Sequence, residues 1–304
     1  MTITVKARSK NLKDVTLASH ATLTSVLSQI SAANGGINTN RLRLTYKKED
    51  KHVPITVSDY FLEQPDDVLY VKDLGPQISW RMVFVAEYLG PILVHTALYK
   101  LSQRQDLAWL RSDAQQYNPH LNRVAYLLIL VHYVKREFET LFVHSFSQST
   151  MPLFNLFKNS FHYWILNGMI GLAYFGYGFP LSNAAVVWLY SKLRLNNVYK
   201  LIGLFLVSEI WNFYTHLQLR WWGDLQKRKG VTSRVPINSG IFKLLVAPNY
   251  TFEVWSWIWF ALVMKLNVFA LLFLGVSTAQ MYLWAVKKNK RYGTRRAFLI
   301  PFLF

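Results

Sequence analysis

Long apolar runs dominate the chain after residue 73. A helix rises about 1.5 Å per residue, so about 20 apolar residues can cross a bilayer. We place single spans at about residues 80–99, 123–144, 161–179 and 198–217, and a hairpin of two more at 252–286 that breaks near residue 266. Residues 74–304 are therefore predicted to form an all-α polytopic membrane domain of about six transmembrane helices, with seven as the alternative.

Residues 1–73 have the shorter periodicities of a small α+β domain. Alternation at residues 3–8 and 42–46, and the apolar run 68–71, predict strands. Apolar residues at helical spacing over 23–30 predict a helix that ends at Gly35 and Gly36. This order resembles a ubiquitin-like (β-grasp) domain, although other small α+β folds share it.

The second apolar run, residues 123–144, ends in a polar half. His132, Tyr133, Arg136 and Glu139 follow helical spacing and share about one face. An ionisable residue inside a span costs roughly 2.5–3.5 kcal/mol and usually marks a function or faces a wet cavity. A hydroxyl one turn from a fixed cation suits an anionic cofactor and a proton transfer. The alternative is that the span ends near Tyr133 and the charges lie at the interface.

Two further polar features lie within predicted spans. Glu87, near the middle of the first span, favours a functional role over a structural ion pair with Arg81 or another neighbour. In the fourth span, Glu209, Asn212 and His216 form a polar stripe that continues to Arg220. The basic loop that follows favours an anion-binding surface over simple helix–helix association.

Composition supports a membrane protein, since 52% of the residues are hydrophobic and only 16% are charged, against about 25% in soluble domains. The absence of cysteine excludes disulfides and thiolate chemistry. The net charge of +18 is more consistent with cytoplasmic segments of a membrane protein than with nucleic-acid binding. The basic N-terminal region, loop 221–248 and tail are predicted to be cytoplasmic, which six spans allow.

Known motifs exclude several chemistries. No G-x-G-x-x-G, P-loop, H-E-x-x-H or G-x-S-x-G pattern occurs, and the histidines form no compact metal-ligand pattern. Tyrosine, glutamate, asparagine and basic residues remain on the membrane helices. They are consistent with hydride transfer from a reduced nicotinamide dinucleotide to a conjugated carbonyl compound.

Several motifs together resemble one family over essentially the whole chain. They are GPQISW at 75–80, EYLGP at 87–91, HYVKR at 132–136, ETLFVH at 139–144, APNY at 247–250 with Glu253, and the end 295–304. The chain resembles the very-long-chain trans-2-enoyl-CoA reductases of fatty acid elongation, within the steroid 5α-reductase family.

The resemblance implies an enzyme of the endoplasmic reticulum membrane with cytosolic termini. It would use NADPH to saturate long-chain enoyl-CoA in the last step of the elongation cycle, supplying sphingolipid and other lipid synthesis beside the other elongation enzymes. Tyr133 and Glu87 match the family's polar pair at the substrate carbonyl, and Tyr250 is a further candidate proton donor. The cofactor-side matches are Asn212, Arg220, Asn249, Glu253 and Arg296, with Lys135 and Arg136 for phosphates or the CoA moiety.

Two positions depart from the family pattern. His216, which we keep among the cofactor-side residues, stands where steroid-reducing members carry an acid. The segment around 292–295 is shorter than the family's tyrosine-rich motif, so Tyr292 receives no role. A steroid or sterol reductase of the same fold and a non-enzymatic membrane adaptor with a ubiquitin-like head remain as alternatives.

Overall fold

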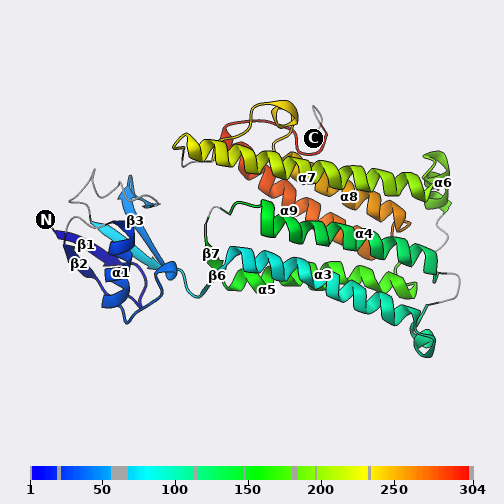
Figure 1. Cartoon of the computed structure of the whole chain (residues 1–304), viewed down its shortest axis with the longest axis horizontal. Helices are drawn as coiled ribbons and strands as arrows, with labels where there is room; N and C mark the ends of the chain where they lie inside the picture. Colours follow the sequence, from blue (N-terminus) through cyan, green and yellow to red (C-terminus); the bar gives the residue numbers. More distant parts are fainter. Residues whose placement is uncertain are drawn as a thin grey trace. The chain divides into compact units, whose positions relative to one another are not determined.

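A computed structural model describes residues 2–18, 22–55, 68–112, 116–146, 148–179, 184–195, 197–231 and 234–300. The chain divides into two compact units (Figure 1). The N-terminal unit comprises Met1–Trp80 with Gln148–Asn155, and the helical unit comprises Arg81–Ser147 with Leu156–Phe304. The last four residues of the 295–304 motif lie outside the described residues.

The N-terminal unit is a mixed sheet with one helix, α1 (Leu23–Ala33), on one of its faces. The strand order is β2-β1-β5-β3-β4, with β1 and β5 parallel and the other pairs antiparallel. The strands are β1 (Thr2–Ala7), β2 (Val15–Ala18), β3 (Leu42–Lys48), β4 (Lys51–Pro54) and β5 (Leu69–Asp73). A short turn of helix, η1 (Thr39–Arg41), precedes β3. This β-grasp-like arrangement confirms the predicted fold of the unit.

The core of this unit follows the predicted periodicities. Val5, Leu44 and Val71 point inward from three strands, and Val26 and Ile30 pack against them from α1. Thr22 caps α1 by accepting a hydrogen bond from the Ser25 amide. We did not predict β2 and β4, because each has only four residues and too few alternating positions to stand out.

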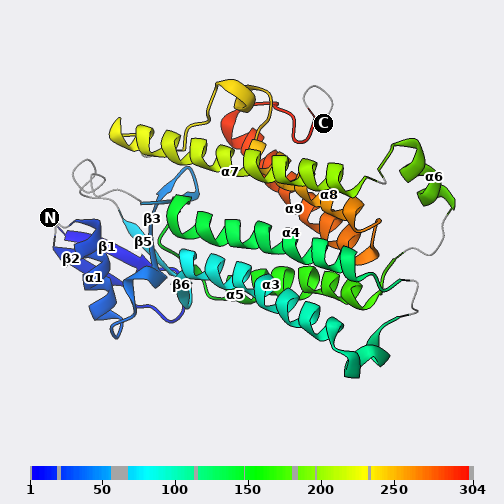
Figure 2. The ribbon, with the colours of Figure 1, turned by 45° about the vertical axis from the view of Figure 1, so that its right-hand side comes forward.

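In its described residues, the helical unit contains seven α-helices and several irregular helical turns (Figures 1 and 2). The α-helices are α3 (Trp80–Gln103), α4 (Pro119–Phe138), α5 (Phe154–Ser160), α6 (Ala184–Lys192), α7 (Val198–Arg228), α8 (Pro248–Val263) and α9 (Val268–Tyr292). The turns are η2 (Gln105–Leu110), η3 (Glu139–Val143), η4 (Phe161–Asn167), η5 (Gly168–Phe175) and η6 (Gly240–Lys243). The short strands β6 (Gln77–Ser79) and β7 (Thr150–Pro152) pair just before α3 and α5.

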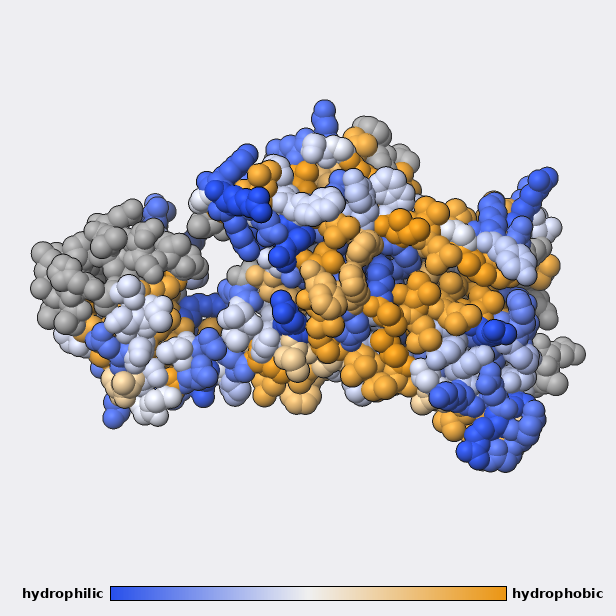
Figure 3. All heavy atoms as spheres, viewed as in Figure 1, coloured by the Kyte–Doolittle hydropathy of each residue, from blue (hydrophilic) through white to orange (hydrophobic). Residues whose placement is uncertain are grey.

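Among the described helices, α3 and α9 are long and apolar enough to cross a membrane by length and composition. The helices α4 and α7 are also long, but they carry the charged residues of the site described below. Hydrophobic side chains gather on the visible outer surface of the helical unit (Figure 3). Exposed examples are Leu93, Val131, Phe142, Ile210 and Leu283.

Several predicted boundaries were wrong. The fourth helix continues to Arg228, so residues 221–228 are helix and not loop. Residues 145–160, which we expected to be a loop between the second and third spans, contain β7 and α5. The run 161–179 is helical but irregular, passing from π-helical to 3₁₀ geometry at Gly168. The break between α8 and α9 falls at residues 264–267, as predicted.

Close packing in the helical unit depends on glycine. An added Cβ at Gly90 would lie 2.0 Å from the indole nitrogen of Trp164. The same indole donates a hydrogen bond of 2.8 Å to the Ala86 carbonyl. Gly90 therefore lets η4 pack directly against α3, one turn from Glu87 and Tyr88.

Candidate active site

A buried network of charged side chains joins α4, η3, α7 and α8. It contains the carboxylates of Glu139, Glu209 and Glu253 and the cations of Lys135 and Arg136. Buried charges are costly unless they are paired and hydrogen-bonded. Each of these groups has at least one partner of opposite charge, so the network can exist inside an apolar bundle.

Lys135 joins α4 to α7. Its Nζ lies 2.7 Å from Glu209 Oε2 and 3.8 Å from Glu139 Oε1, and it donates to the Asn212 side-chain oxygen. Asn212 in turn donates to the Asn249 carbonyl at 2.7 Å and to Glu253 Oε2 at 3.1 Å. The polar stripe of α7 is thus held against both α4 and the start of α8.

His132 lies between two carboxylates. Its Nδ1 is 2.9 Å from Glu209 Oε1, and its Nε2 is 3.3 Å from Glu253 Oε1. Carboxylates only accept hydrogen bonds, so both ring nitrogens must carry a proton to satisfy both contacts. An imidazolium here balances the three carboxylates against three cations.

Arg136 lies at the other side of the network. Its Nη1 is 2.6 Å from Glu139 Oε2, and its Nη2 donates to the Tyr88 hydroxyl at 2.6 Å. His216 Nδ1 also contacts Glu139, at 3.0 Å from Oε1, and its Nε2 lies 3.2 Å from Asn249 Nδ2. Arg136 therefore links α3, α4 and η3, and His216 extends the network to the start of α8.

Tyr133 is fully buried next to this network. Its ring lies 4.8 Å from that of His132 and 6.2 Å from those of Tyr88, Tyr163 and Trp257, measured between centroids. Its hydroxyl has no hydrogen-bond partner among the described residues. The Asn249 side-chain oxygen is likewise buried without a partner there. A buried polar atom without a partner is costly, so these two atoms are candidate contacts for bound molecules.

Glu87 is also buried, on α3 beside Tyr88. It accepts a hydrogen bond of 3.2 Å from Asn159 Nδ2 on α5. The ion pair with Arg81 that we considered is not formed within the described part of the chain, where Arg81 is exposed. No direct hydrogen bond joins Glu87 and Tyr133 in that part either. Tyr88 is next to Glu87 in the chain, and its ring centroid lies 6.2 Å from that of Tyr133.

Three predicted site residues make contacts outside this network: Arg220, Tyr250 and Arg296. Arg220, half-exposed, binds Asp224 at 2.7 Å and the Val143 carbonyl at 3.3 Å. Tyr250 packs in a separate small core, with Lys288 Nζ 4.3 Å from the ring centroid.

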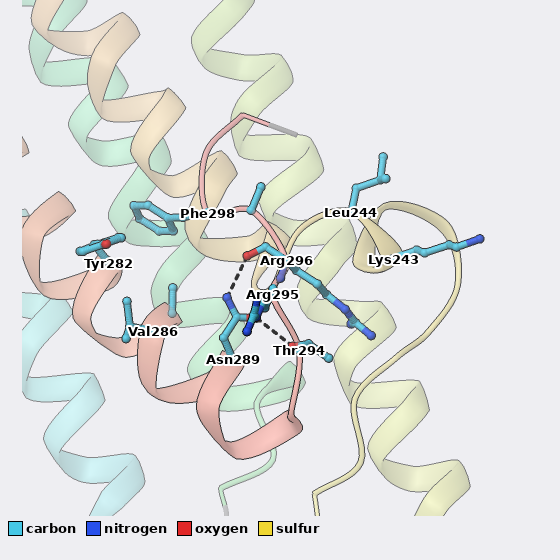
Figure 4. A pocket seen from close by; sticks show the side chains of 11 residues that line it. Lys243, Leu244, Tyr282, Val286, Asn289, Thr294, Arg295, Arg296 and Phe298 are labelled. Carbon is cyan, nitrogen blue, oxygen red and sulfur yellow. Dashed lines mark hydrogen bonds between the residues drawn. The ribbon is translucent and has the colours of Figure 1, made fainter. Parts of the chain in front are cut away.

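Arg296 lines an open pocket of about 800 Å³ near the end of α9, where Lys243, Asn289 and Thr294 also lie (Figure 4). Its Nη1 donates to the carbonyls of Ile237 at 2.8 Å and Phe242 at 2.7 Å. The guanidinium therefore ties the chain end to the loop after α7.

A metal ion is not the natural occupant of this network. The potential ligand atoms of Glu139, His144 and His216 lie within 4.8 Å of one another. However, Arg136 and Lys135 already hold the Glu139 carboxylate, and their positive charges oppose a nearby metal cation. The donor set fits an ion-pair network better.

Seven of the residues predicted from the sequence lie in this network or beside it: Tyr133, Lys135, Arg136, Asn212, His216, Asn249 and Glu253. Sequence reasoning did not assign site roles to Tyr88, Tyr163, Asn159 or Trp257. Aromatic residues are common in every span of this chain, so only the fold singles these out. The adjacency of Tyr88 to Glu87 was the one available signal.

Comparison with known proteins places the chain among enoyl-CoA reductases. The 3-oxo-5-alpha-steroid 4-dehydrogenase family matches residues 149–304. A very-long-chain enoyl-CoA reductase of Dictyostelium discoideum is 34% identical over 97% of this chain and 96% of its own length. A putative enoyl reductase of Schizosaccharomyces pombe is 39% identical over 83% of this chain and 79% of its own. A probable very-long-chain enoyl-CoA reductase of Caenorhabditis elegans is 34% identical over 86% and 85%. The chain therefore belongs to the steroid 5α-reductase family of membrane enzymes, on its very-long-chain enoyl-CoA reductase branch.

Proposed function

We propose that this protein reduces the trans-2 double bond of very-long-chain enoyl-CoA to give saturated acyl-CoA, with NADPH as the reductant. The observation that carries the proposal is the buried Tyr133 hydroxyl, which has no partner among the described residues and lies beside a charge-balanced network. The near full-length similarity to enoyl-CoA reductases supports the same reaction.

The reaction needs one hydride and one proton. Bound NADPH would supply the hydride to the β-carbon of the enoyl thioester, and a protein group or water would supply the proton to the α-carbon. Negative charge develops on the thioester oxygen as the hydride arrives. A hydrogen-bond donor aimed at that oxygen stabilises this charge in a site that excludes water.

Tyr133 is the donor that we assign to this role. Its hydroxyl is not held by another side chain of the described residues, whereas the neighbouring Tyr88 hydroxyl accepts from Arg136. Glu87 would complete the substrate-carbonyl side if it carries a proton, because a protonated carboxyl also donates. Tyr133 or Tyr250 would supply the α-proton, directly or through water.

The residues toward α8 fit the cofactor. The Asn249 side-chain oxygen offers a buried acceptor for an amide N–H₂ group. Asn212 and Glu253 lie next to it, and His216 contacts its side chain. Lys135 and Arg136 are largely buried with their carboxylate partners, whereas Arg220 and its partner Asp224 are both half-exposed. Arg220 is therefore better placed for phosphate groups, with Arg296 a second candidate.

The family and the two apolar helices support a membrane location. We further propose six spans in the endoplasmic reticulum membrane, with both termini and the basic segments on the cytosolic side. The polar ends of α4 and α7 would then face the cytosol, where NADPH and acyl-CoA are available. Other elongation enzymes are the expected neighbours there.

A steroid reductase is the second candidate, because the matching family is described as 3-oxo-5-alpha-steroid 4-dehydrogenase. The test is NADPH oxidation by detergent-purified protein with a long-chain trans-2-enoyl-CoA and, in parallel, with a Δ4-3-ketosteroid. We expect oxidation with the enoyl-CoA alone. Oxidation only with the steroid would reject the proposed substrate. NADPH binding without either reaction would point to another reducible lipid, and no NADPH binding by folded protein would favour an adaptor.

A further inference from the structure

The N-terminal sheet has two different faces. One face packs against α1 through the buried residues of β1, β3 and β5. On the other face, alternate positions of the same strands point outward, and several of them are basic. Besides Lys47, which pairs with Asp50, the cations of this outer face are Lys6 on β1, Arg43 on β3 and Lys72 on β5, with Arg8 just beyond β1. We call these four residues the basic face.

The strand register brings these cations together. Arg43 stands directly opposite Lys72 on the neighbouring strand, and Lys6 stands opposite Tyr70. Burial lowers the pKa of His52, and Arg8 and Lys47 lower it further. Since the His52 ring packs edge-on against Tyr70 at 4.7 Å, Arg8 lies near the same side of the sheet.

No carboxylate of the described residues lies within ion-pairing distance of these four cations. Asp14 accepts from the Ala7 amide, Asp50 pairs with Lys47 at the β3–β4 turn, and Asp73 pairs with Arg41. None of the four basic-face cations has an ion-pair partner in the described part of the unit. Like charges directly opposite each other destabilise a sheet, so this arrangement is not explained by the stability of the unit.

The chain limits the distance between the N-terminal sheet and the start of α3. Strand β5 ends at Asp73, and α3, which is suited to crossing the membrane, begins at Trp80. The connecting segment can extend at most about 25 Å. A short tether gives the unit a high effective concentration at the bilayer surface. Juxtamembrane cations are attracted to anionic lipids, mainly within a Debye length of that surface.

We propose that the basic face docks on anionic phospholipid headgroups of the membrane that α3 enters. The exposed cations Lys6, Arg8 and Lys72 contact lipid phosphates and carboxylates, while the uncharged α1 side of the unit stays in water. This interaction is separate from the reductase chemistry. It would hold the N-terminal unit flat against the bilayer in anionic membranes and release it in neutral ones or at high salt.

The absence of cysteine makes this orientation measurable in the full chain. A single cysteine is introduced at Thr4, on the outer face, or at Ser28, on the exposed side of α1. Each is labelled with an environment-sensitive fluorophore, and the protein is placed in nanodiscs with lipids that carry a quencher at the headgroup. We expect several-fold stronger quenching at position 4 when a third of the lipid is phosphatidylserine than in phosphatidylcholine alone, with reversal by salt and little change at position 28.

The variant K6E/K72E tests the face itself. We expect it to lose the lipid-dependent quenching at position 4. The matched variant K48E/K51E makes the same change in net charge at the exposed β3–β4 turn and should keep it. Enoyl-CoA reduction and the thermal midpoint report folding of both variants.

Equal quenching at positions 4 and 28, or no difference between the two membranes, would overturn the proposal. The proposal would also be overturned if K6E/K72E kept the lipid-dependent quenching at position 4 and lost only binding to an acidic protein. Unchanged reductase activity in any of these cases would leave the proposed function standing, so the two proposals can fail separately.

Discussion

Arg136 Nη2 donates to the Tyr88 hydroxyl at 2.6 Å, and this bond joins α4 to α3 beside Tyr133. The guanidinium also lies 4.9 Å from the centroid of the Tyr88 ring. The Tyr88 hydroxyl thus has an internal partner, while the Tyr133 hydroxyl has none among the described residues. Two tyrosines of similar burial therefore differ in their hydrogen bonding, and we propose different roles for them.

Replacing each tyrosine by phenylalanine should separate these roles. Tyr133→Phe removes a hydroxyl without a partner in the described residues, so stability should change little. Its kcat should fall about 10²–10³-fold, because the thioester oxygen loses its hydrogen-bond donor. Tyr88→Phe removes the acceptor of a charged donor and should lower the free energy of unfolding by about 1.5–3 kcal/mol. Steady-state kinetics and thermal unfolding measure both. Normal turnover of Tyr133→Phe together with an inactive Tyr250→Phe would transfer the donor role to Tyr250.

The pair of Lys135 and Glu209 should be costly to break from one side. Lys135→Met leaves the Glu209 carboxylate buried without its nearest cation, 2.7 Å away in the native protein. We expect a loss of about 3–5 kcal/mol in unfolding free energy, partly recovered by adding Glu209→Gln. Chemical unfolding in micelles measures this cycle. Arg104→Gln breaks an ion pair with both side chains 60% exposed and should cost less than about 1 kcal/mol. Equal losses at the two sites would contradict a buried network.

Gly90→Ala should open the contact between α3 and η4. The new Cβ would fall 2.0 Å from Trp164 Nε1, so the indole must move and lose its bond to Ala86. We expect a loss of about 1–3 kcal/mol from overpacking and reduced activity, since Glu87 and Tyr88 are on the same helix. Gly203→Ala is the matched control, because an added Cβ there meets nothing within 4 Å on an exposed helix position. That change should be neutral or stabilising by up to about 1 kcal/mol.

The N-terminal unit should lose stability in acid through Asp73. Hydrogen bonds from Arg41, then from Asn11 and the Gly75 amide, lower the pKa of Asp73 to about 2. Because the pKa is lower in the folded state, the stabilisation is fully present above about pH 4 and is lost as the pH falls toward 2.

We expect this effect to be about 1–2 kcal/mol after allowing for the partly exposed Arg41. Pulse proteolysis with pepsin in urea, across this pH range, measures it. Asp73→Asn should flatten the pH dependence, whereas Asp50→Asn, at an exposed turn pair, should leave it unchanged. A slope that survives Asp73→Asn would assign it to other carboxyls.

The sequence predicted the network better than it predicted the boundaries. His132, Tyr133, Arg136 and Glu139 stand out because charged residues at helical spacing are rare in an apolar run, and the fold does place them at one centre. Glu209, Asn212 and His216 stand out for the same reason on α7. Charged residues in an apolar helix need partners where the helix packs, so their spacing predicts that they lie together in the fold.

The partners that lack an unusual pattern could not be predicted. Tyr88 is one aromatic residue among many, and it joins the network only because the fold places its hydroxyl beside Arg136 of α4. The C-terminal end of α7 and the helix α5 were missed because charged and aromatic residues there resemble an interfacial loop. Tertiary contacts decide both cases, and a single sequence does not show them.

Arg296 gives a case in which a residue predicted to bind the cofactor has a visible structural task. Its guanidinium donates to the Ile237 and Phe242 carbonyls and to the Asn238 side chain, which a single ammonium group cannot reproduce with the same geometry. Arg296→Lys should therefore loosen the loop after α7 and speed tryptic cleavage at Lys243 several-fold in the absence of NADPH. Arg295→Lys, at an exposed position, should leave cleavage unchanged. Weaker NADPH binding by Arg296→Lys with unchanged cleavage would instead show that the guanidinium acts on the cofactor and not on the loop.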